Sequence, residues 1–307
     1  MAESDRHPRL GYAMVLGAAS LWAANGVVMK VIIESGGVPR PRLAEVRSTG
    51  AFLVLAVVLA LRRPRSLRLR RSELPLLLAF GVIGLALVQW LYLEAIHRLE
   101  IGVALFVQYL APVLVALWAR FAFHEPVRRR IWAALVLAIA GVALLFELWG
   151  GLTLDGVGVA AALGAAITFA VYILSAERAV SGRDPVSLVC YGFLLASIFW
   201  AIVQPWSSFP AHQLDETVSL LGRLADLSLP VWLLMAWMVV LGTIVPFALL
   251  AAALRHVPAS RAAITAMFEP VAATLFAFAW LAESLSAFQL FGGAVVLGAI
   301  ALAQTSH

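Results

Sequence analysis

Residues 90–125 read WLYLEAIHRLEIGVALFVQYLAPVLVALWARFAFHE, and residues 248–283 read ALLAAALRHVPASRAAITAMFEPVAATLFAFAWLAE. The two stretches align without a gap at an offset of 158, which places Pro112 on Pro270. Both are apolar over a length that could cross a lipid bilayer. The chain therefore repeats itself, and this repeat is the strongest indication of its fold.

The repeat extends toward the start of each half, where LGAASLWA at 16–23 resembles LGAAITFA at 163–170. We expect two repeats of five helices each, covering 10–149 and 155–304. Because five is odd, the second repeat enters the membrane from the opposite face and has inverted topology. Inverted repeats are common in secondary transporters, although architecture alone does not establish a function.

The composition is that of a membrane protein. Hydrophobic residues make up 63% of the chain and charged residues 13%, with a mean hydropathy of +0.96. The apolar runs are rich in Ala, Leu and Val and do not alternate strictly, which favours helices over barrel strands. We therefore predict an all-α integral membrane protein with ten transmembrane helices, at 10–33, 42–61, 73–97, 100–120, 130–149, 155–177, 185–205, 230–254, 258–281 and 284–304.

The positive charge is distributed unevenly between the two sides of this arrangement. Arginines cluster in the loops 62–73 and 121–130 and near the N-terminus, all on one side. The positive-inside rule places that side, and with it both termini, in the cytoplasm. Contact with lipid headgroups explains the formal charge of +5 better than binding of nucleic acid.

Nothing in the sequence indicates catalysis, so we expect no enzyme activity, no metal and no cofactor. The single cysteine, Cys190, cannot form an internal disulfide or a thiolate cage. The six histidines form no HExxH motif, and neither a GxSxG elbow nor a GxxxxGK[ST] loop is present. A channel is the main alternative to a carrier, because channels also span membranes with polar residues inside. Channels usually rely on rings of like residues, which favours the carrier here.

Several motifs resemble one known family over nearly the whole chain. Helix 1 contains LWAANGVVMK at 21–30, and helix 2 begins with RLAEVRSTGAFLVLA at 42–56. Twice, a proline is followed after about thirteen residues by a glutamate, Glu125 or Glu283, and then by a glycine-containing helix. This doubled pattern resembles the EamA-type branch of the drug/metabolite transporter superfamily. The resemblance implies a bacterial inner-membrane carrier with a central cavity, usually one that exports metabolites such as amino acids or small toxic compounds.

Glu269 is the leading candidate for substrate binding or coupling. It lies at the middle of the run 258–281, where an acidic side chain costs roughly 2.5–3.5 kcal/mol to insert into a bilayer. Such residues usually face the protein interior or a water-filled cavity. Its neighbour Pro270 lacks a backbone donor, so we expect a kink in this helix and a freed carbonyl. The alternative is a structural carboxyl bonded to a neighbouring helix.

Three charged residues toward the outer side form a candidate gate. We expect Arg47 or Lys30 to pair with Glu94 when the cavity faces inward, so that opening would break the pair. The alternative for both cations is that they extend to the membrane interface.

Polar and aromatic residues near mid-depth are the candidates for the cavity wall. Asn and Gln in lipid also serve as hydrogen-bonding links between helices, which is the competing interpretation. The candidates are Trp22, Asn25, Gln89, Gln108, Tyr109, Thr168, Tyr172 and Trp237.

Together these residues predict a secondary active transporter that exports small metabolites, either amino acids or related small amphiphiles, by alternating access through a central cavity. Proton coupling, exchange and facilitated transport remain alternatives, as do import and export. One chain can enclose a cavity, so both a monomer and a homodimer fit.

Overall fold

The computed structural model of the protein describes residues 7–122, 124, 127–149 and 155–305. Glu125, used above in the repeat, lies outside these residues. The described residues of the first half form seven α-helices: α1 (Pro8–Glu34), α2 (Arg40–Arg62), α3 (Leu74–Leu78), α4 (Val88–Arg98), α5 (Ile101–Gln108), α6 (Ala111–Phe121) and α7 (Arg129–Leu145). The second half contains α8 (Gly156–Val180), α9 (Pro185–Val203), α10 (Val231–Val239), α11 (Val245–Ala253), α12 (Ala259–Ala266), α13 (Phe268–Leu281) and α14 (Ala287–Gln304).

Within the described residues, nine helical runs are long and apolar enough to cross a membrane. Several of them join two or more α-helices, and their bounds lie close to those predicted from the sequence. They are Pro8–Glu34, Arg40–Arg62, Arg71–Arg98, Ile101–Phe121, Gly156–Val180, Pro185–Val203, Val231–Ala253, Ala259–Leu281 and Ala287–Gln304. The remaining predicted run forms α7, whose 17 residues are at the lower end of spanning length.

The two halves are interrupted at corresponding places. A π-helical segment joins α3 to α4 at Ala79–Leu87, and another joins α10 to α11 at Val240–Ile244. The next run breaks in both halves, between α5 and α6 and between α12 and α13. The offset of 158 maps the bounds of α5 onto those of α12. Pro270 follows the second break, as the sequence predicted, because proline cannot supply the backbone donor.

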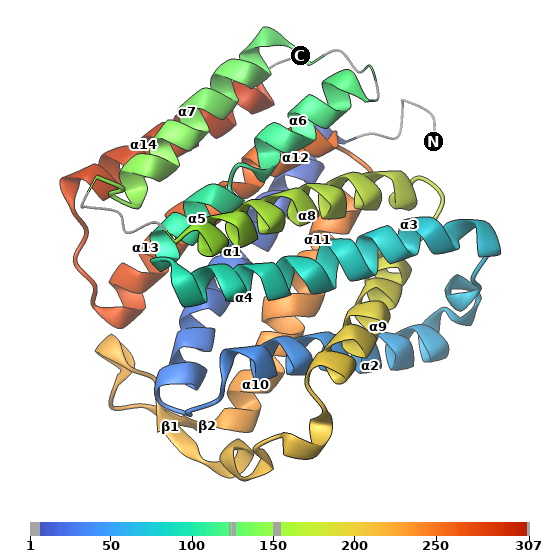
Figure 1. The fold of residues 1–307 in the computed structure, drawn as a ribbon, viewed down its shortest axis with the longest axis vertical. Coiled ribbons are helices and arrows are strands. Elements are labelled where there is room, and N and C mark those ends of the chain that lie inside the picture. Colours follow the sequence, from blue (N-terminus) through green and yellow to red (C-terminus); the bar gives the residue numbers. More distant parts are fainter. Residues whose placement is uncertain (1–6, 123, 125–126, 150–154, 306–307) are drawn as a thin grey trace.

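The halves are interleaved. Helix α1 packs against α11, α12 and α13 of the second half, and α8 packs against α4, α5 and α6 of the first. Helices α2 and α9 pack together, as do α7 and α14, which run side by side along one edge of the molecule (Figure 1). Each first helix thus packs on the interrupted helices of the other half.

Two glycines in the π-helical segments permit this close packing. A Cβ at Gly84 would lie 2.7 Å from the Tyr172 Cα on α8, and a Cβ at Gly242 would lie 2.0 Å from the Asn25 Oδ1 on α1. The offset of 158 maps Gly84 onto Gly242. The two contacts are therefore counterparts, one in each half, and small residues let the helices approach.

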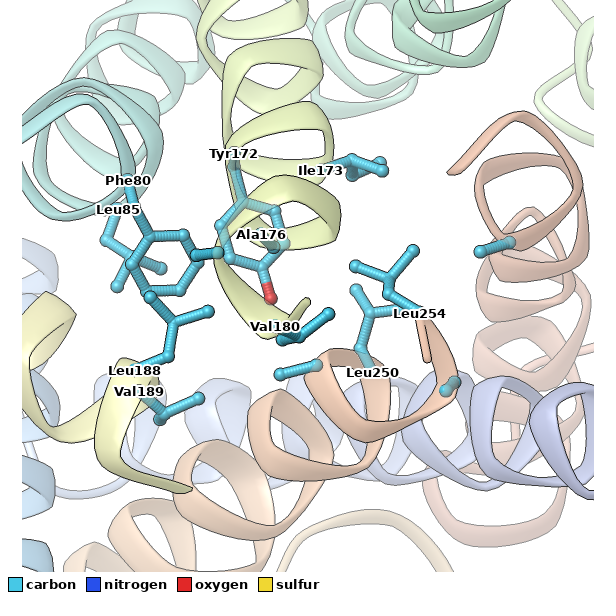
Figure 2. Packing of buried hydrophobic residues seen from close by; sticks show 14 of the residues in the cluster. Phe80, Leu85, Tyr172, Ile173, Ala176, Val180, Leu188, Val189, Leu250 and Leu254 are labelled. Carbon is cyan, nitrogen blue, oxygen red and sulfur yellow. The ribbon is translucent and has the colours of Figure 1, made fainter. Parts of the chain in front are cut away.

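The largest buried cluster surrounds Tyr172, which is 1% exposed. Its ring stacks on Phe80, with 5.2 Å between the centroids. Figure 2 shows Tyr172 projecting from α8, with Leu188 of α9 and Phe80 on one side and Leu250 of α11 on the other. The cluster thus joins helices of both halves into one interior.

The expectation of an all-α fold is wrong in one detail. The connector between α9 and α10 contains two short antiparallel strands, β1 (Thr217–Ser219) and β2 (Ser228–Pro230), in the register Val218↔Leu229. The strands lie beside the end of α1 and the start of α10 (Figure 1). The Trp280 Nε1–H donates to the Leu220 carbonyl at 2.8 Å and so links this connector to α13.

We predict different effects on stability for alanine at two glycines. Gly84→Ala places a methyl group against the α8 backbone and should destabilise the protein by about 1–3 kcal/mol, the usual range for overpacking. Gly298→Ala is the control, because nothing lies within 4 Å of that position. It should be neutral or stabilising, since alanine favours helix. Thermal unfolding of the purified protein in detergent measures both. Equal unfolding temperatures for the two variants would contradict the packing described above.

Candidate functional site

Glu269 lies at the break in the fourth apolar run of the second half. It is the second residue of α13, directly after the end of α12, and it is partly buried. The first backbone N–H groups of a helix have no partner within the helix, and the helix dipole is positive at this end. The break therefore provides an environment that favours an anionic group at mid-depth.

Three side chains from other elements interact electrostatically with this carboxyl group. The Tyr109 hydroxyl, at the break between α5 and α6, interacts directly with Glu269. The Arg47 guanidinium on α2 and the Tyr92 hydroxyl on α4 both lie within electrostatic range of it. We call Glu269, Arg47, Tyr109 and Tyr92 the central cluster. It joins α2 and both interrupted helices of the first half to α13.

Arg47 is held in place by the second π-helical segment. Its Nε–H donates to the Thr243 Oγ1 at 3.2 Å, and the Thr243 hydroxyl donates to the Met238 carbonyl at 2.9 Å. Thr243 is fully buried. The Arg47 guanidinium is thus fixed by a neutral hydroxyl and lies within electrostatic range of the Glu269 carboxyl group.

Several polar atoms near this region have no hydrogen-bond partner among the described residues. Asn25 packs on Gly242, and its Nδ2–H group donates weakly to the Met29 sulfur at 3.3 Å. The Asn25 Oδ1 accepts no hydrogen bond from the described residues. The hydroxyl groups of Ser48 and Thr49, which follow Arg47 on α2, also lack partners. Buried polar groups normally find partners, so these are the atoms that a bound molecule or water inside the bundle would satisfy.

Aromatic side chains lie on the same helix, α1, as the polar residue Asn25 and on α11, which packs against it. The Trp22 ring meets Phe247 edge to face at a centroid distance of 5.1 Å, and Phe247 meets Tyr172 at 5.7 Å. The Trp22 indole N–H and the Tyr172 hydroxyl have no partner in the described part of the chain. Gln89 is similar, because its Nε2 donates to the Leu85 carbonyl while its Oε1 is unpaired.

The other wall candidates have different surroundings. The Thr168 hydroxyl donates to the Gly164 and Ala165 carbonyls of its own helix, at 2.9 and 3.1 Å. Trp237 packs against the cluster that holds Met235 and Met238, near the hairpin connector. Gln108 ends α5, one residue before Tyr109, and is partly buried.

The predicted pairing of Lys30 or Arg47 with Glu94 is not the one in this structure. The Lys30 Nζ lies 2.9 Å from the Glu283 Oε1, and the Arg98 Nε lies 2.6 Å from the Glu94 Oε1. Glu94 and Arg98 are four residues apart on one helix, which brings their side chains together. Arg47 lies about 10 Å deeper than the start of α2, by the rise of 1.5 Å per residue, and reaches the central cluster instead.

Sequence reasoning missed Tyr92, Thr243 and Glu283. The first two have no charge or motif to single them out, and Glu283 was noted only as part of the repeat. The described residues contain no group of three or more His, Cys, Asp or Glu that could hold a metal ion.

Comparisons with known proteins give one consistent family. The chain is 28% identical to the uncharacterized transporter YwfM of Bacillus subtilis over 288 residues, which cover 92% of this chain and 90% of the relative. It is 29% identical to the threonine/homoserine exporter RhtA of Escherichia coli, over 80% of this chain and 74% of that protein. A solved crystal structure shares the fold with a TM-score of 0.76 at 20% identity, covering 95% of this chain and 96% of the other.

The EamA-like transporter family matches the chain twice, at residues 9–147 and 156–305. The two matches correspond to the two halves whose interrupted helices are described above. Together they cover nearly the whole chain, and they agree with the apolar helices and the named relatives. The protein belongs to the EamA-like transporter family and is a multi-pass membrane transporter of the drug/metabolite transporter superfamily.

Proposed function

We propose that the protein is a secondary active exporter of small zwitterionic metabolites, of the amino-acid class, which bind at the central cluster. The observation that carries the proposal is that Glu269, at the helix break, and Arg47, on α2, lie within electrostatic range of each other inside the bundle. These two groups can bind the ammonium and carboxylate groups of one amino acid. Charge-assisted hydrogen bonds of this kind are about twice as strong as neutral ones.

The surrounding residues suit a small polar substrate with a modest side chain. Tyr109 and Thr243 position the two charged groups. The unpaired Asn25 Oδ1 and the hydroxyl groups of Ser48 and Thr49 supply further hydrogen-bonding capacity. Trp22 contributes an aromatic surface. The name of the relative RhtA, a threonine/homoserine exporter, supports the same substrate class at 29% identity.

The interleaved halves support transport by alternating access. We assign residues 10–149 and 155–304 to two inverted five-helix repeats, with α7 as the tenth span. On the positive-inside rule both termini are cytoplasmic, and the bacterial relatives favour the inner membrane. Helices α1 and α8 can then move with the opposite half and expose the central cluster to either side. The Lys30–Glu283 pair is on the side we assign as outer.

Glu269 also offers a means of coupling. A carboxyl group can bind a proton or a substrate ammonium group, but not both at full strength. Inward movement of a proton on Glu269 would then alternate with outward movement of the substrate. This competition gives proton-driven export without any additional site.

We predict that Glu269→Gln abolishes export. The amide cannot bind a proton or pair with an ammonium group, so the export rate should fall by at least about tenfold, the effect expected for losing a buried charged hydrogen bond. Untargeted mass spectrometry of metabolites inside and outside expressing cells, at matched protein level, measures this.

The matched control is Glu100→Gln, which makes the same change at an exposed position at the start of α5. It should export as the wild type does. If Glu269→Gln exports the same compounds at the same rate, Glu269 is structural and the proposed coupling is wrong.

We further predict that Arg47→Gln changes selectivity. Loss of the guanidinium should raise the KM for L-threonine roughly tenfold or more, because a charged hydrogen bond contributes about 1.5–3 kcal/mol. The KM for L-threoninamide, which has no carboxylate, should change little. Counterflow into proteoliposomes measures both and also separates a saturable carrier from a channel.

Arg68→Gln, an exposed change in the loop between α2 and α3, is the control for this measurement. An equal rise in KM for both compounds would mean that Arg47 does not bind the carboxylate.

A further inference from the structure

A pocket lies where the start of α2 meets α4 and the end of α9. Its volume is about 340 Å³. Both charged and aromatic residues line it: Arg40, Pro41, Trp90, Leu93, Glu94, His97, Trp200, Val203 and Gln204. The start of α2 and the ends of α4 and α9 share one side of the predicted topology, the outer one.

Hydrogen-bond donors dominate the polar lining of this pocket. Trp200 is 1% exposed, and its indole N–H has no acceptor among the described residues. Arg40 is exposed, and no carboxylate of the described chain lies within ion-pairing distance of it. Glu94 is the only acidic residue in the lining, and Arg98 neutralises it at 2.6 Å. The pocket therefore favours an anion.

The walls of the pocket are continuous with the lipid-facing surface. Trp90 is 46% exposed, and Val203 is 48% exposed at the end of α9. Ile198 and Ile202, one turn apart on α9, are also exposed. Tryptophan side chains and arginines at helix ends mark the boundary between hydrocarbon and headgroups. The anion expected at this depth, beside an apolar surface, is a phosphate that carries acyl chains.

We propose that this pocket binds the phosphate of a membrane phospholipid headgroup. Arg40 pairs with the phosphate, and the Trp200 indole N–H and the Gln204 amide are the further donors. The acyl chains lie along Trp90 and the exposed face of α9. The volume accommodates a headgroup, and the assignment does not depend on what the central cluster transports.

One member of the central cluster links it electrostatically to the pocket. The Tyr92 hydroxyl, on α4, lies within electrostatic range of both Glu269 and the pocket residue Arg40. A phosphate on Arg40 neutralises one of these two charges. Phospholipid at this position therefore changes the electrostatic environment of Tyr92 and, through it, of the site.

Native mass spectrometry of the purified full chain tests this inference. The probes are phosphatidylethanolamine and phosphatidylglycerol, with diacylglycerol as the phosphate-free comparison. The wild type should retain one phospholipid more tightly than the rest. Arg40→Gln should reduce its retention about tenfold, as expected for a lost charged hydrogen bond. Trp200→Phe, which removes the N–H and keeps an aromatic ring, should reduce it to a smaller extent.

Arg68→Gln and Glu269→Gln are the controls, and both should retain the lipid, so that a failure of the transport proposal can be told from a failure of this one. Retention unchanged in Arg40→Gln would overturn the inference, and so would equal retention of diacylglycerol. Displacement of the lipid by inorganic phosphate would show that the pocket recognises a free anion, and displacement by L-threonine would show that it binds the proposed substrate; either result would overturn the assignment to a phospholipid.

Discussion

The structure depends on how a carboxyl group is accommodated at the middle of a membrane helix. An unsolvated charge there is costly, and the chain lowers this cost locally. The break between α12 and α13 places Glu269 in the first turn of a helix, where free N–H groups and the helix dipole favour an anion. Arg47 supplies the opposite charge, and Tyr109 a hydroxyl. The interrupted helices therefore provide a position for a carboxyl group inside an apolar bundle.

The same interruptions hold the two halves together. Gly84 and Gly242 lie in the π-helical segments, and each receives the first helix of the opposite half. Without a side chain at these positions, α8 and α1 approach closely enough to bring Tyr172 and Asn25 into the interior. Irregular helical segments are common at functional sites. Here the helix breaks, the glycine contacts between the halves and the charged residues Glu269 and Arg47 occur in the same part of the bundle, which fits a site built from both repeats.

Most of the fold could be predicted from the sequence, because a bilayer imposes one simple requirement of length and apolarity. The predicted ends of the helical runs lie within a few residues of those in the structure, and Pro270 indicated the break between α12 and α13. The π-helical segments could not be predicted, since they depend on packing between halves that are far apart in sequence. The β1–β2 hairpin was missed because strands of three residues show too little periodicity to detect.

The site was predicted only in part. Glu269 stood out because a midplane charge is rare, whereas Tyr92 and Thr243 carry no such signal. Arg47 was assigned to the outer gate from depth alone, which does not say toward which helix a side chain points. The Glu94–Arg98 pair could have been predicted from its spacing of four residues.

The most direct test of the account is a cryo-electron microscopy map of the protein with and without L-threonine. We predict added density between the Arg47 guanidinium and the Glu269 carboxyl group, and ligand density elsewhere with this space unchanged would contradict the account.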